Sequence, residues 1–122
     1  MIYTTFSANP KYTIPQLIVH GIKQDKLSIC TTRKKLLQHA GLDENGKLYF
    51  WPNTVLNWIT SQDGYQNYSK KRISTELRKA GILIPEYGGD NTVHLEISGK
   101  RQRFLCLNKE ALYQAASNEI DK

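Results

Sequence analysis

The chain has 122 residues, 39% of them apolar, which suits one domain with a single modest core and excludes wholesale disorder. Its net charge of +6 produces a positive field that attracts polyanions such as DNA, RNA or an anionic membrane surface. No apolar run reaches the roughly 18–20 residues of a transmembrane helix, and no secretory signal opens the chain. We therefore expect a cytoplasmic protein that does not bind membranes.

The metal-ligating residue types are too scattered to form a site. Cys30 and Cys106 lie far apart without CxxC spacing, and the three histidines do not cluster. A structural zinc site needs about four closely spaced ligands. We therefore expect no metal and no cofactor. Two isolated cysteines in a short chain also fit a reducing compartment better than a disulfide scaffold.

Residues 1–30 are predicted to form an N-terminal extension. Residues 1–12 alternate weakly, which is typical of a short strand or an arm. Thr13 and Gln16 then form a capping-box pattern, and apolar residues follow at helical spacing. The pattern predicts a helix over about residues 14–24.

Residues 31–60 are predicted to form a helix, a strand and a second helix. Thr31 or Thr32 can cap the first helix, and Gly41 is placed to end it; its buried side would hold Leu36, Leu37 and Ala40. Residues 43–46 have the composition of a turn. Residues 48–51 read as a buried strand, and Pro52 suits the first turn of the next helix.

The following helix is predicted over residues 69–80, after a polar connection at 62–68. Ser69 can cap it, and Gly81 can end it. Ile73, Leu77 and Ala80 form a narrow core-facing stripe. A short strand is predicted at 82–84.

A hairpin is predicted over residues 92–107. Val93, Leu95 and Ile97 alternate with polar residues, a turn follows at 98–101, and residues 103–107 return as a partner strand. We expect the apolar residues of this strand to be buried together with Ile73 and Leu77. Asn108 can cap a final helix.

The order of these elements from residue 31 is that of a winged helix-turn-helix. We therefore expect an α+β fold, with a three-stranded antiparallel sheet plus extra N- and C-terminal helices. Residues 31–108 would be the winged-helix domain, preceded by the extension at 1–30 and followed by a C-terminal helix and tail at 109–122. The hairpin would be the wing, and helix 69–80 the helix that enters a DNA groove.

The basic residues are concentrated around these two elements. Eleven of the 17 Lys and Arg fall in four stretches, at 33–35, 70–72, 78–79 and 100–103. Lysine-rich helix faces are often merely solvated, but the coincidence with the wing favours binding of phosphates. The expected phosphate contacts are Lys70, Lys71, Arg78, Lys100, Arg101 and Arg103. Ser74 is expected to face outward. Ser74 and Thr75 could reach base edges if binding is sequence-specific.

Tyr65 and Tyr68 precede the basic helix and are further candidates. Exposed aromatic rings beside cations can stack on bases. The alternative, which we favour, is that these tyrosines pack their loop onto the core. Trp51 and Trp58 lie in apolar segments and are expected in the core. No Gly-rich phosphate loop and no nucleophile–base pair is visible, so we expect no enzyme activity.

Four short motifs resemble a known group of proteins. They are Gln38-His39-Ala40-Gly41-Leu42, Leu48-Tyr49-Phe50-Trp51-Pro52, Arg78-Lys79-Ala80-Gly81-Ile82-Leu83 and Lys100-Arg101-Gln102-Arg103-Phe104-Leu105. Together, over about residues 31–108, they resemble the C-terminal winged-helix region of the helicase-like replication proteins of plasmids, phages and staphylococcal cassettes. The resemblance implies a nucleic-acid-binding module that supports replication or maintenance of a mobile genetic element. This chain has no Walker motif, so it would supply DNA binding alone.

Two alternative functions remain open at this stage. The chain could be a docking module for a helicase, primase or polymerase, or a transcriptional repressor of a phage or plasmid. A repressor would be a dimer, with contacts supplied by helix 108–118. We expect a monomer or weak dimer that binds single-stranded, duplex or forked DNA.

Overall fold

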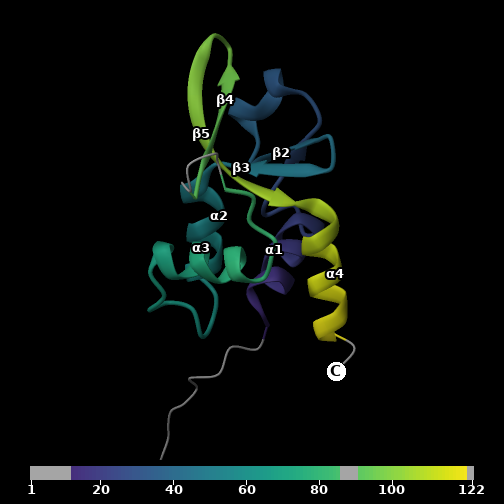
Figure 1. Ribbon diagram of the computed structural model, residues 1–122, viewed down its shortest axis with the longest axis vertical. Helices are drawn as coiled ribbons and strands as arrows, with labels where there is room; N and C mark the ends of the chain where they lie inside the picture. Colours follow the sequence, from purple (N-terminus) through teal and green to yellow (C-terminus); the bar gives the residue numbers. More distant parts are fainter. Residues whose placement is uncertain (1–11, 86–90, 121–122) are drawn as a thin grey trace, which may run out of the picture.

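The computed structural model describes residues 12–85 and 91–120, with side chains up to residue 117. The predicted strand or arm at residues 1–12 lies, except for Tyr12, outside the described residues. The structure is an α+β fold (Figure 1). Its elements are α1 (Ile14–Lys23), β1 (Ile29–Cys30), the 3-10 helix η1 (Arg33–Gln38), β2 (Gly41–Glu44), β3 (Lys47–Phe50), α2 (Pro52–Thr60), α3 (Lys70–Lys79), β4 (Val93–Ile97), β5 (Lys100–Asn108) and α4 (Lys109–Ile120).

The sheet has five strands in the order β1-β2-β3-β5-β4, with β1 and β2 parallel and the other neighbours antiparallel. The predicted three-stranded antiparallel sheet is therefore wrong. The error lies in β1 and β2, because Asp43 and Glu44 read as turn residues but end a strand. The turn consists of Asn45 and Gly46, both with positive φ (56° and 78°), which is the geometry of a two-residue hairpin turn.

The sheet is covered on both faces. Successive side chains of a strand point to opposite sides, so Leu48 and Phe50 of β3 lie in one apolar cluster and Tyr49 lies in another. Leu105 and Leu107 of β5 join the first cluster, which the α-helices cover. The second cluster contains Leu36 of η1, Phe104 and Cys106. The molecule therefore has three layers, with helices on one face of the sheet and the η1 segment on the other.

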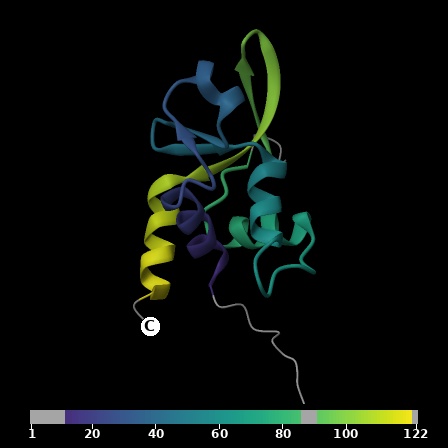
Figure 2. The same ribbon diagram turned by 180° about the vertical axis from the view of Figure 1, so that it is seen from behind.

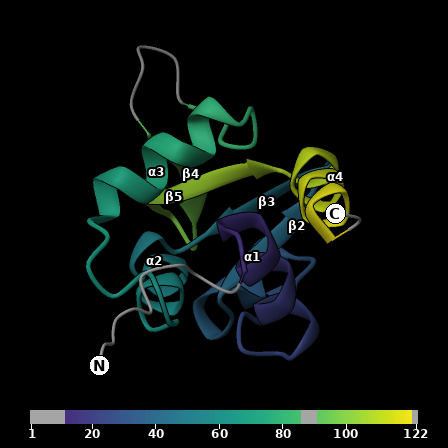
Figure 3. The same cartoon turned by 90° about the horizontal axis from the view of Figure 1, so that it is seen from below.

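The four α-helices share one core on their face of the sheet (Figure 3). The predicted capping box is confirmed, since Thr13 and Gln16 exchange side chain–backbone hydrogen bonds at the start of α1. The Gln16 side chain reaches the carbonyl of Ala116 in α4, 3.5 Å away. Because α1 and α4 share this core with α2 and α3, the packing does not separate residues 12–30 or 109–117 from the region between them.

The helix predicted to begin at Thr31 or Thr32 is replaced by η1. Leu36 is fully buried, whereas Leu37 is 60% exposed, so its predicted burial is wrong. A 3-10 helix has about three residues per turn and presents only every third side chain to one side, so one leucine faces inward. Gly41, predicted to end the helix, instead begins β2.

The predicted hairpin is confirmed, with β4 and β5 joined by Ser98 and Gly99, both with positive φ. The strand predicted at 82–84 is a single bridge between Leu83 and Leu107. The predicted common cluster is wrong. Ile73 and Leu77 lie in the helical core, whereas the apolar side of β4 belongs to the cluster on the η1 face. Ala80, predicted in the core-facing stripe of this helix, is exposed and lies at the C-terminal cap of α3, so its predicted burial is wrong.

Candidate nucleic-acid interface

Helix α3 presents a basic stripe to solvent. The Ser69 side chain accepts a hydrogen bond from the backbone N–H of Arg72, as the sequence predicts for an N-cap. Ile73 and Leu77 fix the buried face of the helix. Lys71, Thr75 and Arg78 follow one another at helical spacing on another side, with both cations exposed and Thr75 half-buried.

Ser74 does not face outward. Its side chain is 6% exposed, so the expected contact with base edges is wrong for this residue. Ser74 lies three residues before Leu77, and residues three apart share a side of a helix. Thr75 is therefore the remaining candidate of the two.

Tyr65 and Tyr68 do not form an open stacking platform. Tyr65 is 5% exposed and donates its hydroxyl to the carbonyl of Tyr12, 2.8 Å away. Tyr68 meets the ring of Tyr65 edge-on, and the guanidinium of Arg72 lies 3.8 Å from the centroid of the Tyr68 ring. The favoured interpretation, that the tyrosines pack their loop onto the core, is confirmed.

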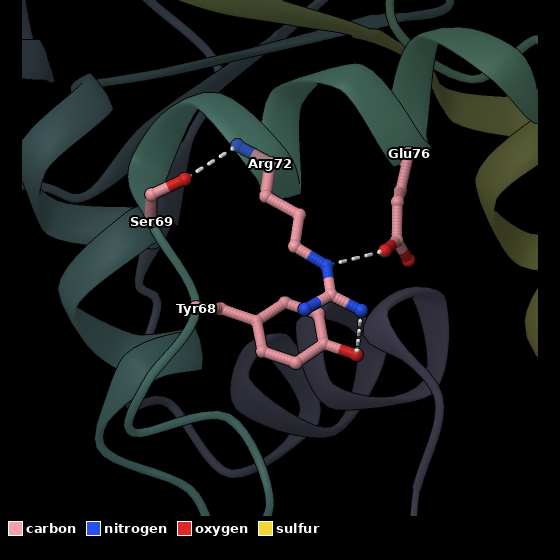
Figure 4. Close-up of polar contacts among 4 residues, drawn as sticks. All are labelled: Tyr68, Ser69, Arg72 and Glu76. Atoms are coloured by element: carbon pink, nitrogen blue, oxygen red, sulfur yellow. Dashed lines mark hydrogen bonds and ion pairs between the residues drawn. The ribbon is translucent and has the colours of Figure 1, made fainter.

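The guanidinium of Arg72 is paired with neighbouring side chains of the chain itself. Its Nε donates to Glu76 at 3.2 Å, and a terminal nitrogen donates to the Tyr68 hydroxyl at 3.1 Å (Figure 4). Arg72 therefore contributes less to the external field than its neighbours Lys70 and Lys71, which are not paired with a carboxylate among the described residues.

Helix α3 is connected to the first turn of α2 through Lys70. The ammonium of Lys70 donates to Asn53 Oδ1 at 2.8 Å. Helix α2 contains no acidic residue, and its first turn exposes Asn53 and Thr54. Asn53 is a contact that sequence reasoning missed, because an uncharged residue in another helix carries no signal of this pairing.

The first turn of α2 also lies at the base of the β4–β5 hairpin. Phe50, the last residue of β3, pairs with Leu105 of β5. The next residue, Trp51, places its ring 4.5 Å from that of Phe104. The chain therefore leaves the sheet for α2 beside Phe104 and its neighbour Arg103.

The cations of the hairpin are divided between its two faces. Alternation along β5 places Arg101 and Arg103 on the side of Leu105 and Leu107, which is the side of the α-helices. Lys100 lies on the opposite side, across from Ile97. The three hairpin cations, expected to act together, therefore do not share one surface.

The opposite end of α3 approaches the other side of the hairpin base. Arg78 donates to Asn91 Oδ1 at 3.2 Å, two residues before β4 begins. Both ends of α3 thus contact segments that border the hairpin. We call the exposed cations on this side the helix-side basic surface; it consists of Lys70, Lys71, Arg78, Arg101 and Arg103.

Among the described residues, the acidic side chains near this surface are few. Glu76 is paired with Arg72, and Glu96 lies directly opposite Arg101 in the hairpin. A field of one sign on one side of a protein attracts polyanions and raises their association rate. The arrangement can therefore hold a chain of phosphates along α3 and up the hairpin.

The described residues contain no group of three or more His, Cys, Asp or Glu side chains able to hold a metal ion. Within the same residues, no helix combines the length and apolar character that crossing a bilayer requires. Comparisons with protein-family models, with curated proteins and with solved structures found no match for this chain. The functional argument therefore rests on the surface itself.

Proposed function

We propose that this chain is a winged-helix DNA-binding domain without enzyme activity. The main support for this proposal is the position of the cations. Lys70, Lys71 and Arg78 belong to α3, which lies on the same side of the sheet as Arg101 and Arg103 of the hairpin. Phosphate neutralisation by Lys and Arg is the main source of protein–DNA affinity, and it does not depend on base sequence.

The order of the elements supports the winged-helix interpretation. Helix α1, strand β3, helices α2 and α3, and strands β4 and β5 follow in winged-helix order, and these strands lie in the spatial order β3-β5-β4. In this proposal α1 is the first helix of the domain, in place of the helix expected at residues 31–40. β1, η1 and β2 are then an insertion between α1 and β3.

The biological setting that we propose follows from the sequence motifs. Their resemblance to replication proteins of mobile elements suggests a module that brings a helicase or primase to DNA. A chain of this kind would act through binding alone, with the partner supplying ATP hydrolysis. In this role the helix-side basic surface holds DNA, and other faces remain open to the partner.

A salt titration of DNA binding tests the proposal. Fluorescence anisotropy with a labelled duplex would compare the wild-type chain with the double variant Arg101→Ala/Arg103→Ala. We expect the variant to bind more weakly and to lower the slope of log K against log salt by about one to two units, because each phosphate contact contributes roughly 0.9 on duplex DNA.

The matched control is Lys23→Ala/Lys26→Ala, which removes the same charge from exposed positions at and after the end of α1. This control should leave the slope close to that of the wild type. If both double variants behave alike, general charge and not the helix-side basic surface determines binding. If the wild-type chain binds no DNA, docking on a helicase, primase or polymerase becomes the better proposal.

A further inference from the structure

The β4–β5 hairpin has a second basic side, formed together with η1. Lys100 lies on the hairpin face that packs toward η1, since its partner Ile97 shares an apolar cluster with Leu36. Lys34 and Lys35 of η1 are exposed. In Figure 1 and Figure 2 the hairpin and η1 project together from the same end of the molecule.

Helix η1 is held firmly against the sheet. The indole N–H of Trp51 donates to the carbonyl of Leu36 at 2.9 Å, and the Leu36 side chain is fully buried. Arg33 makes two hydrogen bonds to the carboxylate of Glu44, at 3.1 and 2.9 Å. The side chains on the outer side of η1 are therefore presented by a fixed backbone.

The charge balance on this side remains positive. Glu44 neutralises Arg33 through an ion pair. Lys34 and Lys35 have no carboxylate partner among the residues that the structure describes, and the same holds for Lys100. Lys34 and Lys35 on η1, and Lys100 on the hairpin face that packs toward η1, therefore offer positive charge to an anion from another molecule.

An exposed apolar side chain accompanies these lysines. Leu37 is 60% exposed, more than any other large apolar side chain among the described residues. A duplex conceals the faces of its bases, whereas a single strand offers them to apolar contacts. Leu37 beside lysines therefore fits an unpaired strand better than a duplex.

We propose that the hairpin separates two arms of a DNA junction, with the duplex on the helix-side basic surface and an unpaired strand on Lys34, Lys35, Leu37 and Lys100. This inference rests on the proposed DNA binding and specifies the DNA as forked. Because the hairpin carries cations on both faces, the two groups of cations cannot contact the phosphate backbone of the same DNA strand. At a fork the two DNA strands diverge, so each group of cations can contact a different strand.

Three labelled probes test this proposal, namely a fork with single-stranded arms, the matched duplex and the matched single strand. The wild-type chain should bind the fork more tightly than either other probe. The variant Lys34→Ala/Lys35→Ala/Lys100→Ala should weaken fork binding roughly tenfold and lower its salt slope by about two units, at roughly 0.7 per single-strand contact. Its affinity for the duplex should remain within about twofold of wild type.

Two further variants separate this inference from the proposed function. Arg101→Ala/Arg103→Ala should weaken both fork and duplex binding, and Leu37→Ala should weaken fork and single-strand binding without changing the salt slope. If the chain binds duplex through Arg101 and Arg103 but the triple-lysine variant loses nothing on the fork, the junction proposal is overturned and the proposed function stands. Absence of all DNA binding overturns both.

Discussion

Trp58 of α2 donates its indole N–H to the carbonyl of Leu17 in α1, 2.8 Å away and 41 residues apart in the chain. Gly21, one turn further along α1, permits this approach. A Cβ atom at Gly21 would lie 2.8 Å from Trp58 Nε1 and 3.0 Å from the Leu27 side chain. The indole ring of Trp58 therefore packs directly against the backbone of α1, and α1 is part of the packing of the domain.

Replacement of Ile18 by alanine should destabilise the whole fold. Ile18 is fully buried in the core that the four α-helices share. Removal of a buried aliphatic side chain costs about 2–5 kcal/mol in the free energy of unfolding. Denaturant unfolding measures this value, with Leu37→Ala as the exposed control that should change stability by less than about 0.5 kcal/mol. A cost for Ile18→Ala as small as that of the control would mean that α1 is an appendage.

Lys71 and Arg72, neighbours on α3, should respond differently to substitution by alanine. Lys71→Ala should lower the salt slope of duplex binding by about one unit and leave stability unchanged. Arg72→Ala should destabilise the chain by about 0.5–1 kcal/mol, because it removes the contact with the Tyr68 ring. Its salt slope should change less, since Glu76 already neutralises Arg72. The opposite ranking of the two variants would show that Arg72 is the phosphate contact.

The two cysteines should remain reduced and protected in the folded chain. They lie in one row across the sheet, since Cys30 pairs with Leu42, Leu42 with Tyr49 and Tyr49 with Cys106. Three strand spacings of about 4.8 Å separate their Cα atoms by roughly 14 Å, whereas a disulfide requires less than about 7 Å. Both residues are buried, and burial raises the pKa of the Cys106 thiol.

A thiol reagent should therefore modify both cysteines only after unfolding. Absorbance of the released chromophore would be recorded with and without denaturant. Mild oxidation should produce no intramolecular disulfide, as judged by mass spectrometry. Rapid modification of the native chain would contradict the burial of both residues.

Glu44→Gln should remove a small, pH-dependent part of the stability. The hydrogen bonds from Arg33 hold the pKa of the Glu44 carboxyl below its ordinary value. A lowered folded-state pKa stabilises the fold above the unfolded pKa of about 4.3, and this contribution is lost as the pH falls through the folded value. Because the pair is partly exposed, we expect a difference of about 0.2–1 kcal/mol at pH 7.

Urea unfolding of the wild type and Glu44→Gln from pH 7 to pH 3 checks this sign. The two stabilities should differ at neutral pH and converge at the acid end. Glu110→Gln, an exposed acidic position in the first turn of α4, is the control. A gap that stays constant over the whole pH range would show that the glutamine acts through packing and not through charge.

The sequence predicted the elements that begin with local signals. Thr13, Pro52, Ser69 and Asn108 start the four α-helices as predicted, because a cap or an N1 proline depends on residues within one turn. Residues 29–44 were harder because their structure depends on distant partners. The strand β2 is stabilised by pairing with β1 and β3, and its four residues show no clear alternation of apolar and polar side chains.

The candidate surface was predicted in part for a related reason. All six expected phosphate contacts are exposed, which follows from their charge. Their faces depend on the position of the hairpin turn. The sequence indicated a turn over 98–101, but Ser98 and Gly99 alone occupy it. Consecutive residues of a strand point to opposite faces, whereas residues of a turn do not follow this alternation. Because Lys100 and Arg101 were assigned to the turn, their separation was not predicted.

The order of the strands leaves very little open edge on the described sheet. β1, at one end, consists of two residues, and β4, at the other, carries the charged Glu96 and lies in contact with η1. Unpaired edges recruit strands from other molecules, and short or charged edges oppose this. The short strand β1 and the contact of η1 with β4 therefore limit the growth of this sheet by addition of strands from other molecules.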